Sequence, residues 1–133
     1  MRLSALRLTL AGGALLAASG TVLAQDLAEG ARLFNKCLPC HTVGRGASNG
    51  IGPVLNGLDG RKAGSVAGYS YTDAHRKAVI TFNEQTFRDY VRDPRAQIPG
   101  TLMRMTGITS DKEIAELWAY LKRFAPDGSI KKP

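Results

Sequence analysis

The chain has 133 residues and a formal net charge of +7 at pH 7, and 44% of its residues are hydrophobic. This length is typical of one small domain, and no internal repeat or low-complexity segment occurs. The basic residues are dispersed and no binding motif accompanies them. This pattern argues against nucleic acid as a partner and favours acidic protein surfaces.

Residues 1–24 have the three parts of a secretory signal peptide. Two arginines and no acidic residue come first, an apolar run follows over residues 8–18, and small or aliphatic residues occupy positions 22–24. The apolar run is shorter than the roughly 20 residues that span a bilayer, which disfavours the alternative of an uncleaved anchor. We therefore predict cleavage after Ala24 and export to the periplasm, with no stable membrane insertion.

The predicted mature domain, residues 25–133, remains basic. Removing Arg2 and Arg7 from the 18 basic residues leaves 16 against 11 acidic residues, a balance of +5. The two arginines are separated, so a twin-arginine signal is absent and the chain is expected to cross the membrane unfolded. Any covalent cofactor would then be attached outside the cytoplasm.

The first predicted helix leads directly into the most informative motif of the chain. Leu27, Ala31 and Phe34 recur at helical spacing, which predicts a helix over residues 26–36. The sequence C-L-P-C-H follows at residues 37–41 and has the C-x-x-C-H pattern of c-type haem attachment. Its two thiols are spaced to add to the two vinyl groups on one haem edge, and the adjacent imidazole can then bind the iron.

Other chemistries also use cysteines at this spacing. Cys37 and Cys40 could form a disulfide or the redox motif of a thioredoxin-like protein, but no strand precedes them and no βαβ pattern surrounds them. A zinc site would need a fourth ligand besides these cysteines and His41, and His75 is the only other histidine. The sequence therefore favours haem, with Cys37 and Cys40 as attachment points and His41 as an iron ligand.

The middle of the chain predicts loops and two short helices. Glycines are dense between residues 42 and 56, which is compatible only with a loop. A short helix is expected over residues 72–78. Another helix is expected to begin at a capping box formed by Thr81 and Glu84 and to stop at Asp93-Pro94.

The last helix has the clearest pattern. Ser110 and Glu113 form a second capping box, and apolar residues then recur at helical intervals from Ile114 to Phe124, ahead of Pro126. Strand periodicity is absent from the sequence. The glycine-rich loops cannot form a core by themselves, and a haem would supply the missing apolar volume. We predict an all-α domain of short helices and loops wrapped around one haem.

Many segments of the chain, in order and at nearly the same spacing, resemble the small soluble class I cytochromes c of mitochondria and the bacterial periplasm. The resemblance covers nearly all of residues 25–125. Besides the haem motif it rests on Gly52-Pro53, Gly60-Arg61-Lys62, Tyr69 to Ala74, Asn83 to Thr86, Tyr90, Pro94, Ile98 to Thr101, Met103, Gly107-Ile108 and Ala119 to Lys122. It implies the class I cytochrome c fold and one haem c, bound covalently through the two cysteines.

The resemblance also implies that the second iron ligand is Met103. The loop over residues 98–103 is similar to the ligand loop of the family, and Met105 then serves as a flexible apolar cover for the haem. His75, among charged neighbours, is expected to be a surface group. A ligand pair of His41 and Met103 keeps the iron six-coordinate and raises its reduction potential relative to two histidines.

Supporting roles near the iron follow from the same resemblance. The Pro53 carbonyl is expected to accept the Nδ1 proton of His41, and the Tyr90 hydroxyl is expected to donate to the Met103 sulfur. These two contacts would orient the ligands on either side of the iron.

The resemblance further implies how the haem propionates are held. Arg61 and Tyr71 are expected to neutralise or hydrogen-bond the inner propionate, because a buried carboxylate must be paired, and Thr101 is expected to contact the other. Phe82 departs from the family, in which many members have a tryptophan that donates to a propionate. His75 or water is expected to replace that contact.

The resemblance implies structural roles for three further residues. Gly30 and Tyr120 resemble the close crossing of the terminal helices, where glycine lets the aromatic ring approach. Trp118 stands where an aliphatic residue is common and is expected to pack in the core or at its margin.

The resemblance implies an electron carrier and not an enzyme. No acid–base pair, nucleophile or open iron position is visible, since Met103 would close the face where oxygen or peroxide binds. Lys36, Arg45 and Arg95 match basic family positions around the haem edge and are expected to steer a monomeric carrier onto acidic docking faces. Some family lysines are replaced here, which makes docking more dependent on apolar contact; the replacements are Leu102, Thr109 and Ser110.

Three functions are compatible with these features. The first is a periplasmic shuttle from a cytochrome bc complex to a terminal oxidase, and the second is the dedicated electron acceptor of one periplasmic dehydrogenase. The third, a haem peroxidase or gas sensor, would require Met103 to be absent or labile. The sequence favours the first two and does not separate them.

Overall fold

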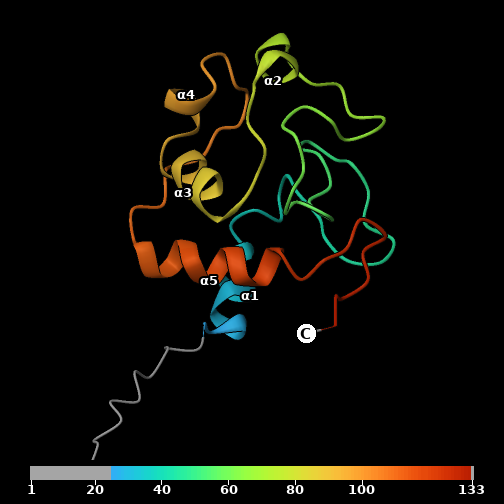
Figure 1. Ribbon diagram of the computed structural model, residues 1–133, viewed down its shortest axis with the longest axis vertical. Coiled ribbons are helices and arrows are strands. Elements are labelled where there is room, and N and C mark those ends of the chain that lie inside the picture. The colour runs from blue at the N-terminus through green and yellow to red at the C-terminus, as the bar shows by residue number, and fades with distance from the viewer. Residues whose placement is uncertain (1–24, 133) are drawn as a thin grey trace, which may run out of the picture.

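The structure is a computed structural model that describes residues 25–132 (Figure 1). The predicted signal peptide, residues 1–24, lies outside the described residues. Within residues 25–132, no helix combines the length and the apolar character that crossing a membrane requires.

The described residues form five helices and no extended strand. The helices are α1 (Leu27–Phe34), α2 (Asp73–Lys77), α3 (Glu84–Arg92), α4 (Pro94–Gln97) and α5 (Asp111–Leu121). Pairing of the β type is limited, over residues 25–132, to isolated bridges between Lys62 and Thr81 and between Phe124 and Ile130. The all-α prediction is confirmed.

Helix α1 is shorter than its sequence pattern suggested. The Asp26 side chain caps its first turn by accepting the backbone N–H groups of Ala28 and Glu29 at 2.9 and 3.0 Å. The helix ends at Phe34, and residues 35–40 continue in turns in place of the two further helical residues expected. Local backbone bonds in these turns, not a continuing helix, therefore shape the segment that holds the two cysteines.

The terminal helices cross closely, and α5 lies directly over α1 in Figure 1. Gly30 is buried at the crossing, where a Cβ atom would meet the backbone oxygen of Glu116 and lie 2.7 Å from Tyr120 Cβ. The expected role of Gly30 and Tyr120 is confirmed. Because the obstacle includes backbone, only a residue without a Cβ lets the helices approach this far.

The start of α3 corrects the predicted capping box. Asn83, not Thr81, is the N-cap: its side chain accepts the N–H of Thr86 at 3.0 Å, and the Thr86 hydroxyl accepts the N–H of Asn83 at 2.9 Å. Thr81 is used elsewhere, in the bridge to Lys62. The error is a shift of two residues, which arises because several neighbouring polar residues suit a cap.

Helix α4 was not predicted, although the residues that start it were recognised as a helix stop. Asp93 ends α3 and caps α4, since its carboxylate accepts the N–H of Ala96 at 3.0 Å. Pro94 then takes the first helical position, where its missing N–H costs nothing. The same Asp-Pro pair therefore ends one helix and begins the next.

The hydrophobic core lies between α1, α3 and α5. Leu33, Ile114, Leu117 and Leu121 are each 1% exposed, and Trp118 is 3% exposed. The Trp118 ring packs on Phe87 with centroids 5.1 Å apart, so it belongs to the core proper. The further core residues are Phe34, Leu58, Ala63, Phe82, Phe87, Tyr90, Val91, Ile98 and Ile108.

Candidate functional site

The two cysteines and His41 lie on a tight turn directly after α1. The N–H groups of Cys40 and His41 both donate to the carbonyl of Cys37, at 3.0 and 2.8 Å. Both thiols are free and half-buried, and burial raises the pKa of Cys37. The turn gathers two thiols and one imidazole within five residues, as joint attachment to one flat cofactor requires.

The His41 ring is fixed from its Nδ1 side. Nδ1 lies 2.7 Å from the carbonyl oxygen of Pro53, which accepts its proton and leaves Nε2 available to bind a metal. Burial lowers the pKa of His41 and so favours the neutral ring that a metal needs. Pro53 in turn is positioned by the glycine before it.

Gly52 provides the space in which the His41 ring sits. It is buried, its N–H donates to the Cys40 carbonyl at 2.8 Å, and a Cβ placed on it would lie 2.7 Å from Nδ1 and 2.8 Å from Nε2 of His41. Real side chains do not approach so closely, so ring or loop would have to move. Glycine at this position therefore sets the orientation of the imidazole.

We expect Gly52→Ala to disturb the site and Gly50→Ala to leave it nearly unchanged. Overpacking of this kind costs about 1–3 kcal/mol, and displacement of the ring should also lower the yield of protein loaded with the expected cofactor. A Cβ on Gly50 meets only the Cys40 carbonyl oxygen, at 3.6 Å, an ordinary contact. Denaturation midpoints and visible spectra of the two variants provide the measurement, and equal behaviour would contradict the assigned role of Gly52.

The second loop of interest contains the two candidate methionines. It turns at Gly100, whose φ of 94° lies in the region that favours glycine, and the N–H of Thr101 donates to the carbonyl of Ile98 at 2.9 Å. The N–H of Met103 donates to the Thr101 hydroxyl at 3.1 Å, which fixes the start of the methionine segment. Met103 and Met105 are both half-buried and pack against the core.

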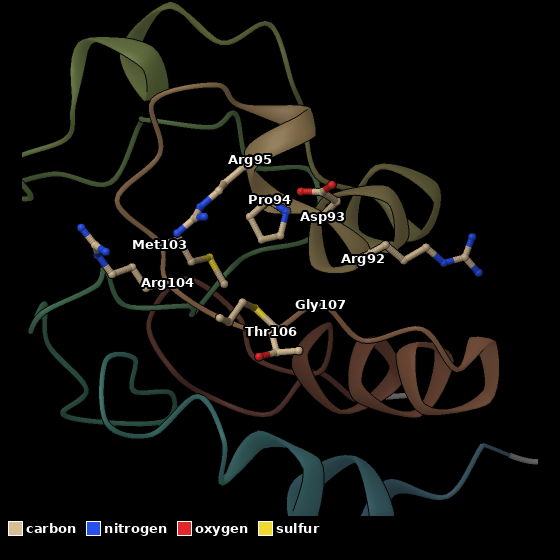
Figure 2. A pocket seen from close by; sticks show the side chains of 9 residues that line it. Arg92, Asp93, Pro94, Arg95, Met103, Arg104, Thr106 and Gly107 are labelled. Atoms are coloured by element: carbon tan, nitrogen blue, oxygen red, sulfur yellow. The ribbon is translucent and has the colours of Figure 1, made fainter.

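A cavity of about 600 Å³ lies between the methionine segment and the junction of α3 with α4 (Figure 2). Met103 and Met105 line it, together with Arg92, Arg95 and Arg104. Figure 2 shows the Arg95 side chain reaching toward Met103, whereas Arg92 and Arg104 point outward on opposite sides. The methionine side of the site is therefore open and basic. The residues that line this cavity do not include the cysteines or His41.

Two expectations near Met103 differ from the structure. The hydroxyl of Tyr90 is not placed on the Met103 sulfur; it lies 3.3 Å from Nε2 of His75 and 3.4 Å from Oγ1 of Thr101. His75 is half-buried and faces Tyr90, so its ring is only partly at the surface, and its expected contact with a haem propionate stays a prediction. The charged neighbours in sequence point away because α2 is a helix, which turns successive side chains to different sides.

Arg61 and Tyr71 have backbone partners in the structure. Arg61 Nη1 donates to the carbonyls of Val54 and Asn56 at 2.9 and 3.1 Å, and the Tyr71 hydroxyl accepts the N–H of Val66 at 3.2 Å. Burial lowers the pKa of Arg61, yet no carboxylate of residues 25–132 pairs with it. A half-buried guanidinium without an anion fits a site that receives an acidic group.

Asn56 closes the loop behind His41, and the sequence did not predict this role. Asn56 is 8% exposed; its side chain accepts the N–H of Gly44 at 2.8 Å and donates to the Gly44 carbonyl at 2.9 Å. Its own carbonyl holds Arg61. A lone asparagine in a glycine-rich loop gives no pattern that indicates such a bond, so only the fold could reveal it.

Comparisons with known proteins agree with this geometry. The sequence model of the family described as cytochrome c matches residues 27–124. The chain is 56% identical over 107 residues to cytochrome c2 of Rhodoplanes tepidamans, covering 80% of this chain and 100% of that protein. It is 50% identical over 105 residues to cytochrome c-550 of Bradyrhizobium diazoefficiens, covering 79% of this chain and 77% of the relative.

A solved structure extends the likeness to the fold. Cytochrome cH from Methylobacterium extorquens superposes with a TM-score of 0.68 at 37% identity, covering 73% of this chain and 97% of that one. The chain belongs to the cytochrome c family. As a cytochrome c it carries one c-type haem, bound covalently through Cys37 and Cys40, and it is an electron carrier and not an enzyme.

The residues of this cytochrome c fit the haem. The free thiols lie on one turn, the His41 ring presents Nε2 while Pro53 holds Nδ1, and Arg61 lacks an anionic partner among residues 25–132. When bound, the haem supplies an iron that gains or loses one electron. The protein contributes the covalent attachment, the orientation of the ligands and the apolar surroundings.

Proposed function

We propose that this cytochrome c is a periplasmic one-electron carrier whose iron is bound by His41 and Met103. The observation that supports the proposal best is the 2.7 Å bond from His41 Nδ1 to the Pro53 carbonyl, since it leaves Nε2 as the only free ring nitrogen. Met103 is supported by its fixed position after the Gly100 turn and by the loop resemblance. A thioether opposite an imidazole favours the reduced state more than a second imidazole does.

Residues of the chain are expected to hold the haem edge as well as the iron. Arg61 and Tyr71 would bind the inner propionate and Thr101 the outer one. The first of these roles is supported by the half-buried guanidinium of Arg61, which pairs with no carboxylate of residues 25–132. Phe82 cannot donate a hydrogen bond. It is 9% exposed and packs edge-on against Tyr90 with centroids 5.6 Å apart, which makes its role apolar.

The partners that we propose are redox proteins with acidic docking faces: a cytochrome bc complex as donor and a terminal oxidase as acceptor. Lys36, Arg45 and Arg95 are exposed and, within residues 25–132, take part in no ion pair, so they are available to a partner. Leu102, beside Met103, is 69% exposed and adds apolar contact. Delivery to the periplasm rests on the predicted signal peptide, residues 1–24, and the carrier is proposed to act as a monomer.

Electrochemistry and ligand binding of the purified holoprotein test this function. We expect reversible one-electron oxidation and reduction, a low-spin ferric spectrum, and resistance of that spectrum to added azide, because both axial positions are filled. Azide binding at low concentration, or rapid turnover of peroxide, would instead indicate an open iron and a peroxidase. The same spectrum shows whether a thioether is bound, through the weak long-wavelength ferric band.

A further inference from the structure

A chain of polar side chains connects α2 to the methionine segment. Nδ1 of His75 lies 3.3 Å from the Thr72 hydroxyl, and Nε2 lies 3.3 Å from the Tyr90 hydroxyl. The Tyr90 hydroxyl lies 3.4 Å from Thr101 Oγ1, which accepts the N–H of Met103 at 3.1 Å. One titratable ring is therefore linked to the backbone of Met103 through two hydroxyl groups.

The protonation state and the tautomer of His75 together decide how these hydroxyl groups point. In the neutral ring that donates from Nδ1 to Thr72, Nε2 accepts, and Tyr90 must turn its only hydrogen toward His75. The neutral ring with its hydrogen on Nε2 donates to the Tyr90 oxygen, and so does the doubly protonated ring; protonation therefore leaves only the arrangement in which Nε2 donates. The Tyr90 hydrogen is then free to turn toward Thr101 and the methionine segment.

The surroundings allow His75 to change charge within the folded protein. Tyr71 packs against its ring with centroids 5.8 Å apart and feels the charge of Arg61; the propionate that these two residues are proposed to bind would lie on the same side, and Tyr90 approaches from α3. On α2 itself, Arg76 is paired with Asp73 and Lys77 is exposed, so no residue of α2 pairs with the ring. Burial lowers the pKa of His75, and the ring is half-exposed and can exchange its proton with solvent.

We infer that His75 is a proton-linked positioning residue that couples proton uptake to the reduction of this cytochrome, through the Tyr90 hydroxyl. The inference rests on the proposed ligation by His41 and Met103. On reduction, one electron enters from the donor protein, and in the fraction of molecules whose ring changes charge a proton enters His75 from water. Both leave on oxidation. Protonated His75 turns the Tyr90 hydrogen toward the methionine segment, which favours the more electron-rich, reduced site.

The direction of the pH dependence follows from charge. The ferric site carries one positive charge more than the ferrous site, so it binds the His75 proton less tightly. The midpoint potential should be highest at low pH, fall as pH rises through the window where His75 titrates, and level off above it. Because burial lowers the pKa of His75, the window lies on the acid side of about pH 6.5, the ordinary histidine value.

The experiment measures the midpoint potential of the holoprotein as a function of pH in four forms. These are the unmodified protein, His75→Asn, Tyr90→Phe and Lys77→Gln. The asparagine variant keeps a polar side chain but cannot titrate, and Lys77→Gln removes an exposed charge from the same helix as a control. Proton NMR of the His75 ring in both oxidation states gives its proton affinity without any mutation.

We expect the fall in potential in the unmodified protein and in Lys77→Gln, and its loss in His75→Asn; a fall that persists in His75→Asn would come from another group, such as a propionate, and would overturn the inference. The proton affinity of His75 should differ between oxidation states about fivefold or more, as coupled sites usually do. Tyr90→Phe should reduce that difference, because the relay through the hydroxyl is broken. If Tyr90→Phe retains the whole difference, the relay is wrong.

Two other outcomes separate this inference from the proposed function. A flat potential in the unmodified protein, together with the ferric thioether band, would overturn the role of His75 and leave the electron carrier intact. Absence of the thioether band would overturn the proposed ligation first. If His75→Asn does not fold, the NMR titration decides: equal proton affinities in the two oxidation states would overturn the inference.

Discussion

Met103→Ala is expected to abolish the long-wavelength ferric band, because alanine has no sulfur to bind the iron. The reduction potential should fall by a sizeable part of the roughly 0.8 V range that axial ligands span, since a thioether favours the reduced iron. The vacated position should also bind azide, and slow peroxide turnover should appear. Visible spectroscopy and a redox titration of the holoprotein measure these changes.

Met105→Ala is the matched control for the ligand assignment. Met105 also lines the cavity, is half-buried like Met103, and lies two residues away in the same segment. Its loss should keep the ferric band and cost at most about 2 kcal/mol of stability, the lower end of the range for truncating a buried methionine, because Met105 is only half-buried. If Met105→Ala loses the band and Met103→Ala retains it, the assignment of the sixth ligand is reversed.

Gly30→Ala should destabilise the protein by about 2 kcal/mol, within the usual range for overpacking. In an unobstructed helix the same change would stabilise the protein by about 1 kcal/mol. A loss of stability would therefore show that the helix crossing leaves no room for a Cβ at position 30. The added Cβ would meet the backbone oxygen of Glu116 and lie 2.7 Å from Tyr120 Cβ, and backbone cannot rotate away. Urea unfolding of the holoprotein, followed by circular dichroism, measures the loss.

The double variant Gly30→Ala, Tyr120→Ala separates a backbone clash from an aromatic one. Alanine at position 120 removes the ring but keeps the Cβ and leaves the Glu116 carbonyl in place, so little stability should return. Gly50→Ala, whose new Cβ has only an ordinary contact, controls for the substitution itself. Full recovery of stability in the double variant would show that the Tyr120 ring, and not the helix backbone, requires glycine at position 30.

The covalent site could be predicted from the sequence because its residues are neighbours in the chain. Thiols at Cys37 and Cys40 and an imidazole at His41 need only one turn to come together, and a local motif carries that information completely. The terminal helices were predictable for the same reason: their caps and apolar spacing are local. The α3 cap is Asn83 and not the predicted Thr81, which shows that local patterns do not fix the exact start of a helix. Several neighbouring polar residues suit the same helix end.

Contacts between distant segments required either the family resemblance or the structure. The resemblance placed Pro53 at His41, and the 2.7 Å contact now gives that pairing a geometry. The resemblance suggested His75 as a replacement donor to a propionate but not its contact with Tyr90, and neither pattern nor resemblance indicated that Asn56 bonds the backbone of Gly44. Such bonds depend on where loops meet in space, and a single polar residue creates no repeating pattern in the sequence from which they could be predicted.

By itself the sequence determined the chemistry at one face of the haem, the helical class and the basic surface, because these follow from neighbouring residues and from composition. Only the tertiary structure decided how the second face is organised. There Thr101 fixes Met103, Tyr90 bonds His75 instead of the sulfur, and α4 separates α3 from the methionine segment. The physical reason is that side-chain direction is set by the packing of elements far apart in the chain.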